Sequence, residues 1–283
     1  MLLVIGLGCA THADSADSGP DSGEHVVTDY VVNAHTDPDP LVAGEEGTFS
    51  LEVRDQDDLP IEDLQTTHER VVHVQFVSHD LSSFQHVHNE DFAPLTADNL
   101  RTSSFAFPLT LPLAGDYLTV FDFAHHNQYL SRSMTLTAAG EPQQAAAPDL
   151  TLVDEVTVDG VTGQLSFSAP AVPGYEAAWS IYLFDAAGPI SIENDPIVQY
   201  LGADAHIFVA TTDLGWTAHS HAWYPGMETV APGHTMPHVN DGPDMPFHYV
   251  LPASGTYKLW LQFTRASDPD HVFVLPFVFA VEG

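Results

Sequence analysis

The chain carries the same spacing of histidines twice, and this internal repeat limits what it can fold into. His73 is followed seven residues later by an Asp-Leu pair and thirteen residues later by a His-x-His motif. His206 is followed at the same distances by the same two motifs. Two copies indicate a tandem pair of like domains, since a solenoid needs more repeats.

Other signals in the chain point to β-structure. Residues 48–53 and 179–184 alternate between apolar and polar side chains, as half-buried strands do. Both copies continue into a Gly-x-Tyr motif, at residues 115–117 and 255–257. No segment keeps a helical period over three turns. About seven short strands in each copy predict an all-β fold of two tandem immunoglobulin-like β-sandwich domains, with a small closed barrel as the alternative.

Breaks in composition suggest the domain limits. Residues 10–24 are rich in Ser, Asp, Gly and Pro, and residues 141–149 in Gln, Ala and Pro. Such segments cannot bury much apolar surface and are typical of tethers and linkers. The expected organisation is a lipoprotein-type signal at 1–9, a flexible acidic tether at 10–24, a first β-sandwich at 25–140, a linker at 141–149 and a second β-sandwich at 150–283.

The N-terminal segment points to export. Residues 1–8 form a short apolar run that ends at Cys9, the single cysteine of the chain. This pattern resembles the lipobox of bacterial lipoproteins, which implies that Cys9 is lipidated and that the protein is held at the cell envelope, in the periplasm or at the cell surface. The membrane would then be contacted only through Cys9. No other segment approaches about 18 continuous apolar residues, so no transmembrane helix is expected.

The charge and the missing motifs exclude several classes of function. The chain has 39 acidic residues against six Lys plus Arg, a formal net charge of −33. Nucleic acid is therefore excluded as a partner, because nothing could neutralise its phosphates. The sequence contains no Gly-x-Ser-x-Gly, no His-Glu-x-x-His and no phosphate-binding glycine loop. We expect a protein that is not an enzyme, although a three-histidine metalloenzyme stays open.

The repeated histidines predict metal sites. If the chain turns back around residue 80, His73 lies opposite His88, and His86 projects from the same face. Neutral imidazoles within about 6–7 Å of one another can share a cation at about 2.0–2.1 Å per bond. The alternatives are structural histidines bonded across a sheet, and a register slip that turns His73 away. The same rule in the second copy brings together His206, His219 and His221.

The second copy carries further candidate ligands downstream. These are His234, Met236, His238 and His248, with Met245 in the same segment. Thioether and imidazole together favour copper over magnesium or calcium, with zinc as the alternative. Asp80 and Asp213 are interpreted as turn residues, and His125 and His126 as exposed.

Several segments carry a family resemblance. In the second copy they are Tyr200-Leu201-Gly202-Ala203, His206, His219-Ser220-His221, Phe247-His248 and residues 255–263, and in the first copy residues 73–88. They resemble exported bacterial tandem β-sandwich proteins of the YtkA-like, copper-associated envelope type. The resemblance implies an envelope protein that binds copper for storage, buffering or delivery, with an envelope metal-handling protein as a candidate partner. The alternatives are a non-catalytic interaction or surface module with structural histidines and, third, a His-ligated metalloenzyme.

Overall fold

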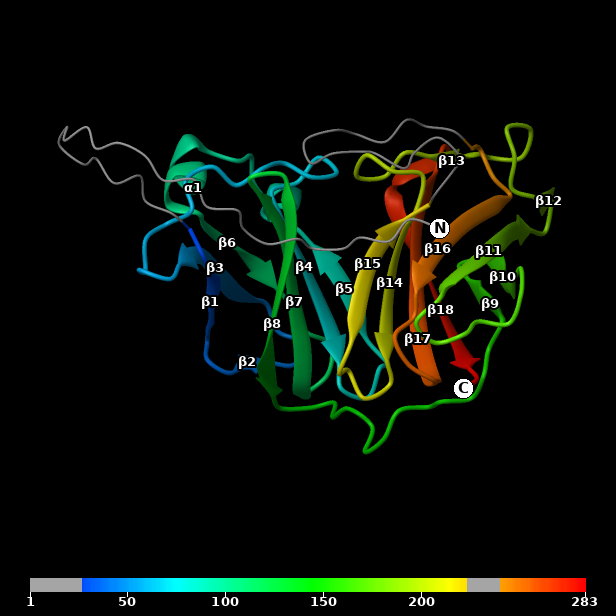
Figure 1. The fold of residues 1–283 in the computed structure, drawn as a ribbon, viewed down its shortest axis with the longest axis horizontal. Coiled ribbons are helices and arrows are strands. Elements are labelled where there is room, and N and C mark those ends of the chain that lie inside the picture. The colour runs from blue at the N-terminus through cyan, green and yellow to red at the C-terminus, as the bar shows by residue number, and fades with distance from the viewer. Residues whose placement is uncertain (1–26, 223–239) are drawn as a thin grey trace, which may run out of the picture.

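The chain folds into two β-sandwich domains in tandem, as the sequence predicts (Figure 1). The computed structural model describes residues 27–222 and 240–283. Strands β1 to β8 build the first domain and strands β9 to β18 the second. No helix in these two described ranges has the length and apolar character needed to cross a membrane. The expected signal, Cys9 and the tether at 10–24 lie outside the described residues.

The first domain consists of two sheets. One has the strand order β1-β3-β6 and the other β2-β8-β7-β4-β5, with antiparallel pairing except between β2 and β8. A 3₁₀ turn and a short helix, which Thr96 caps, precede β6. The elements are β1 (Tyr30–Asp37), β2 (Leu41–Val42), β3 (Gly47–Asp55), β4 (Val72–Ser78), β5 (Phe84–Val87), η1 (Asn89–Asp91), α1 (Ala97–Thr102), β6 (Ser104–Leu109), β7 (Gly115–His125) and β8 (Gln128–Ala139).

The second domain also has two sheets. One has the order β12-β11-β10-β9, with β16 paired to β11, and the other β13-β17-β14-β15, with β18 paired to β17. The strands are β9 (Glu155–Val158), β10 (Val161–Phe167), β11 (Glu176–Asp185), β12 (Gly188–Pro189), β13 (Ile197–Val198), β14 (His206–Thr211), β15 (Thr217–His221), β16 (Asp244–Val250), β17 (Gly255–Arg265) and β18 (Asp268–Val281).

The two domains repeat one topology in their histidine-bearing sheets. The set β8, β7, β4, β5 of the first domain corresponds to β18, β17, β14, β15 of the second. The tyrosine of each Gly-x-Tyr motif is buried and donates a hydrogen bond to the carbonyl four residues upstream, Tyr117 to Leu113 at 2.9 Å and Tyr257 to Ala253 at 2.7 Å. Such a tyrosine corner is typical of immunoglobulin-like sandwiches. The repeat seen in the sequence is thus a repeat of structure.

The central histidine-bearing strand of each of these sheets is buried on both faces. All residues of β4 are buried, and so are those of β14 except its last. In β4, Val74 and Phe76 belong to the core of the first sandwich, whereas Val77 belongs to a third apolar cluster that takes residues from both domains. His73 has the same parity as Val77 and so faces the other domain. The two sandwiches therefore pack through these sheets, which lie side by side at the centre of the molecule (Figure 1).

Aromatic rings fill the apolar part of this interface. Phe84 of the first domain stacks on Phe208 and Trp260 of the second, with ring centroids 5.3 and 5.1 Å apart. Trp260 is only 3% exposed. Burial of such rings supplies most of the apolar driving force for holding two faces together.

We predict that Trp260→Ala destabilises the protein by about 3 kcal/mol, because it leaves a cavity between two surfaces that cannot collapse fully. Urea denaturation followed by far-UV circular dichroism measures the change. Tyr175→Ala is the control, since Tyr175 is 71% exposed and its removal should change stability by less than about 0.5 kcal/mol. Equal effects of the two substitutions would contradict the packing described here.

Candidate metal centre at the domain interface

The β4–β5 hairpin has the predicted register. Gln75 pairs with His86 and Val74 with Val87, so His73 comes opposite His88 at the next position. The carboxylate of Asp80 accepts hydrogen bonds from the Ser78 hydroxyl and from the backbone and hydroxyl of Ser82, which closes the turn. Its predicted role as a turn residue is confirmed.

The β14–β15 hairpin repeats this register in the second domain. His206 pairs with His221, and Phe208 pairs with His219, as the rule from the sequence requires. Asp213 closes the turn by accepting from the Thr211 hydroxyl and the Gly215 amide. We call His73, His86 and His88 triad 1, and His206, His219 and His221 triad 2.

The rings of triad 1 converge on one point. The Nδ1 atom of His73 lies 3.2 Å from Nε2 of His86 and 3.0 Å from Nε2 of His88, and the last two atoms are 3.0 Å apart. Nitrogens bound to one cation at about 2.0–2.1 Å are about 3.3 Å apart in a tetrahedral site and about 2.9 Å apart at right angles. The observed triangle therefore has the size of a metal coordination face.

The outer nitrogen of each ring in triad 1 is held by an acceptor. Nε2 of His73 donates to the Thr67 carbonyl at 2.9 Å. Nδ1 of His86 donates to the Gln262 side-chain oxygen at 3.0 Å, and Nδ1 of His88 donates to the Asp91 carboxylate at 2.9 Å. Because a carbonyl or carboxylate oxygen can only accept here, these bonds fix the proton on the outer nitrogen. The three inner nitrogens present lone pairs.

Burial keeps these rings neutral. His73, His86 and His88 are at most 7% exposed. Burial holds the pKa of His73 and of His86 well below the usual value of 6.5, and the neighbouring imidazoles lower it further. Burial also lowers the pKa of His88, although Asp91 opposes the shift. Neutral imidazole is the form that binds metal ions.

Triad 2 repeats the arrangement in part. Nε2 of His206 donates to the Tyr200 carbonyl at 2.8 Å, as His73 does to Thr67, and its Nδ1 lies 3.3 Å from Nε2 of His219. Nε2 of His221 is buried and has no hydrogen-bond partner among the described residues. One ring nitrogen from each of the three lies within 4.8 Å of the others.

The two triads form one cluster, whereas the sequence predicts a separate site in each repeat. The ring of His219 lies 4.8 Å from that of His86 and 5.4 Å from that of His73, between centroids. The outer contacts also cross the interface. His86 of the first domain donates to Gln262 of β17, and Nδ1 of His219 lies 3.5 Å from the carboxylate of Asp122 on β7. Gln262 and Asp122 occupy equivalent positions, seven residues after the glycine of each Gly-x-Tyr motif.

A seventh histidine joins the cluster, and the sequence analysis missed it. His68 stacks on His221 across the interface, with centroids 3.6 Å apart. It lies in a tight turn with positive φ at two residues, and this turn presents the Thr67 carbonyl to triad 1. The second repeat has the same turn after Tyr200, with Leu201 in place of His68. Extending the alignment of the repeats five residues upstream of His73 would have found it.

Other predicted ligands lie elsewhere. His248 is on β16, in the other sheet of the second domain, and its ring contacts Glu176. The prediction that His248 is a ligand of the second site is therefore wrong. Met245 is fully buried in the core of the second sandwich and is not available as a ligand. The remaining predicted ligands lie outside the described residues: His234, Met236 and His238.

His125 and His126 differ from the expectation that both are exposed. His125 is 2% exposed, and both of its nitrogens are engaged, Nε2 with Asp63 at 2.7 Å and Nδ1 with the Tyr30 hydroxyl at 2.7 Å. His126 is exposed and lies 3.5 Å from Asp63. These three side chains could hold an ion by distance. Because both nitrogens of His125 already have hydrogen-bond partners, neither is open to a metal ion in this group.

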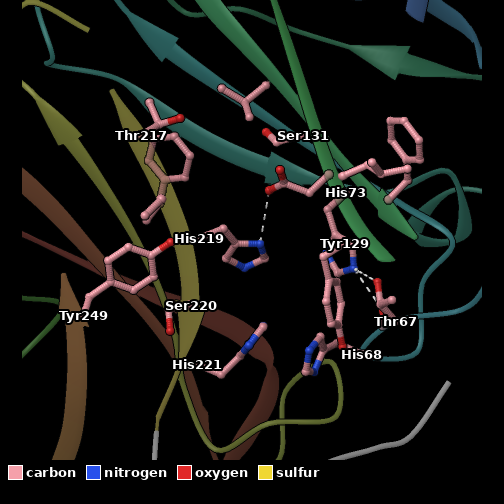
Figure 2. A pocket seen from close by; sticks show the side chains of 16 residues that line it. Thr67, His68, His73, Tyr129, Ser131, Thr217, His219, Ser220, His221 and Tyr249 are labelled. Carbon is pink, nitrogen blue, oxygen red and sulfur yellow. Dashed lines mark hydrogen bonds and ion pairs between the residues drawn. The ribbon is translucent and has the colours of Figure 1, made fainter. Parts of the chain in front are cut away.

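A cavity of about 400 Å³ opens beside triad 2. Figure 2 shows the rings of His68, His73, His219 and His221 around it, drawn from both domains. Asp122 also lines it, and one oxygen of this carboxylate is buried without a hydrogen bond from the described residues. The cavity gives the histidine cluster room for a small ligand.

Comparison with known proteins identifies the repeats but not their role. The domain of unknown function DUF8832 matches residues 25–140 and 156–283. Among curated proteins, none matches the sequence significantly.

Three bacterial proteins are among the solved structures that match this chain. Trypsin-activated alpha-2-macroglobulin from Escherichia coli is 12% identical over 89% of this chain and 15% of that one, with a TM-score of 0.27. The Escherichia coli adhesin FdeC is 15% identical over 89% and 64%, with a TM-score of 0.26. Latent PorU from Porphyromonas gingivalis is 10% identical over 93% and 21%, with a TM-score of 0.28. The chain thus spans less than two thirds of each of these proteins.

We predict that the metal-free protein loses stability as the pH falls below about 6.5. The pKa of His68 is lowered to about 4 by burial, with a smaller contribution from His219. As the pH falls from 6.5 towards 4, His68 binds a proton in the unfolded chain but not in the folded chain. The contribution of neutral His68 to stability is therefore complete above this window and is lost within it. One such imidazole costs about 2 kcal/mol between pH 6.5 and 5.

Urea denaturation in a chelator at pH 7.5 and pH 5 measures the loss. His68→Leu, which copies the second repeat, should reduce the pH dependence, and His79→Ala, at an exposed position of the same domain, should not. An unchanged pH dependence in His68→Leu would show that this ring accepts a proton in the folded state.

Proposed function

The chain belongs to the DUF8832 family, and we propose that it binds a transition-metal ion, copper first and zinc second, at the histidine cluster between its two domains. The ion would be stored, buffered or delivered at the cell envelope. The proposal concerns a binding protein and not an enzyme.

The observation that carries the proposal is the triangle of bare nitrogens in triad 1. Three neutral rings turn lone pairs toward one another at 3.0–3.2 Å, while their protons are used on the far side. Three acceptors facing one another repel, and no hydrogen bond can form among them. A cation at their centre removes the repulsion, and the outer hydrogen bonds then orient the ligands.

The donor set indicates the class of metal. Triads 1 and 2 offer only imidazole nitrogens, which suit copper, zinc, nickel and iron rather than magnesium or calcium. Copper(II) binds such sites most tightly in the divalent series. Met245 lies in the core of the second sandwich, so Met236 is the one thioether among the proposed ligands that favours copper.

Burial at the interface supports a role in holding the ion. The ligands of triad 1 are covered by the second domain through Gln262 and His219. Release would require the domains to separate or the cluster to open, which favours storage or buffering over rapid exchange. The net charge of −33 attracts cations to the protein. Export and anchoring through a lipidated Cys9 remain part of this proposal, and so does an envelope partner that exchanges metal.

We predict that changing His86 and His88 together to Ala abolishes tight binding of copper(II) or zinc(II) at triad 1. Loss of two of three ligands leaves too few bonds to offset the dehydration of the ion. Competition titration against a chromophoric chelator measures affinity, and circular dichroism checks folding. The control is His79→Ala, which removes an exposed histidine from the same hairpin.

We also predict that Gln262→Leu weakens binding by about 10–100-fold without removing a ligand, because it frees the proton and orientation of His86. The same titration measures it. Equal affinity and an equal number of bound ions in the wild type and in the His86/His88 double variant would overturn the assignment of triad 1 as a metal site, whatever the effect at Gln262.

A further inference from the structure

We propose that triads 1 and 2 form a single two-metal centre whose two ions share a small oxygen ligand, water or hydroxide, supplied through the adjoining cavity. This inference rests on the proposed function and deepens it, because it assigns a second metal site and a ligand class to the same cluster.

The first support is the near-identical geometry of the two triads. Counted in chain order, the first and second rings of each triad are close to parallel. Their centroids are 5.4 Å apart with an interplanar angle of 26° in triad 1, and 5.6 Å apart with an angle of 25° in triad 2. The first and third rings are edge-on in both, at 4.7 Å and 87° and at 4.5 Å and 83°. The second and third rings are 4.5 Å and 63° apart in triad 1 and 5.0 Å and 59° in triad 2. If one triad binds an ion, the other has the same shape for a second.

The second support is the closeness of the triads. One ring nitrogen each of His73, His86 and His219 lies within 4.8 Å of the others, although His219 belongs to triad 2. The ring of His206 lies 6.0 Å from that of His86. Ions held by donors this close are neighbours, as in two-metal sites where a shared ligand lies between them.

The third support is electrostatic. Two divalent cations in a buried cluster of neutral imidazoles repel each other and need negative charge nearby. Asp91 accepts from His88 at 2.9 Å, and Asp122 lies 3.5 Å from His219. A bridging hydroxide adds a further negative charge between the ions, and a metal ion favours this form of its bound water.

Unpartnered polar groups at the cluster fit such an oxygen ligand. Gln75 is fully buried opposite His86, and neither polar atom of its side chain has a hydrogen-bond partner among the described residues. Oδ2 of Asp122 accepts no hydrogen bond from them either, although Nδ1 of His219 lies 3.5 Å from it. Three-histidine sites leave coordination positions open. The cavity of about 400 Å³ lined by His73, His219 and Asp122 provides the path for a small ligand to reach them (Figure 2).

Copper(II) titration of the full chain with electron paramagnetic resonance tests the inference. We expect the wild type to bind two more equivalents than a variant that has lost all six triad histidines. At full loading, the integrated signal from these two ions should fall far below the copper bound, because a shared ligand couples their spins. His206→Ala/His221→Ala should bind one equivalent less than the wild type and show the full signal of an isolated ion. The control is His271→Ala, at a partly exposed histidine of the second domain.

The outcomes separate this inference from the proposed function. One equivalent at the cluster overturns the two-metal centre and leaves the binding function. Two equivalents with a full, uncoupled signal overturn the shared ligand. No copper at the cluster overturns both. If the variants fail to fold, the number of ions bound by the wild type, its integrated signal and a metal–metal distance from X-ray absorption still decide the matter.

Discussion

The histidine cluster depends on one packing interaction, the burial of two equivalent sheets against each other. The outer face of β7-β4-β5 needs a cover, and β17-β14-β15 provides it, because Phe208 and Trp260 of the second domain pack against Phe84 of the first. The same contact excludes water from the rings beside it. Excluded water leaves the imidazoles neutral, and neutral imidazoles can turn lone pairs inward. The burial of the histidine rings, their neutral charge and the convergence of their nitrogens thus all follow from this one interface.

This arrangement links stability and binding. Lone pairs of His73, His86 and His88 that face one another in a dry site lose their hydration without gaining hydrogen bonds in return. The metal-free state is therefore less stable than the apolar packing alone would make it. An ion bound only by the folded chain stabilises it by mass action. Because both domains supply contacts to the cluster, the ion would also hold the domains together.

The sequence predicted the fold class and both hairpin registers, because a two-residue period and an Asp turn are local signals. It could not predict that the two triads meet, since nothing in the local pattern of either repeat specifies how two domains dock. Strand β4 is buried throughout, and its polar residues His73 and Gln75 lie on the face that meets the second domain. The prediction for His248 was wrong for a different reason: its strand β16 pairs with β11 and so belongs to the other sheet of the second domain.

The places where the repeats differ suggest how the two halves of the cluster divide their roles. Triad 1 is backed by the amide of Gln262, whereas the equivalent position behind triad 2 holds the carboxylate of Asp122. His68 stands where the second repeat has Leu201, and its ring covers triad 2. The cavity touches two histidines of triad 2 and only one of triad 1. Triad 1 is thus the closed half, with the outer nitrogens of its rings held by acceptors, and triad 2 is the half that borders the cavity. The two repeats keep the six histidines and differ in the groups around them, so the two halves share a geometry but not their surrounding contacts.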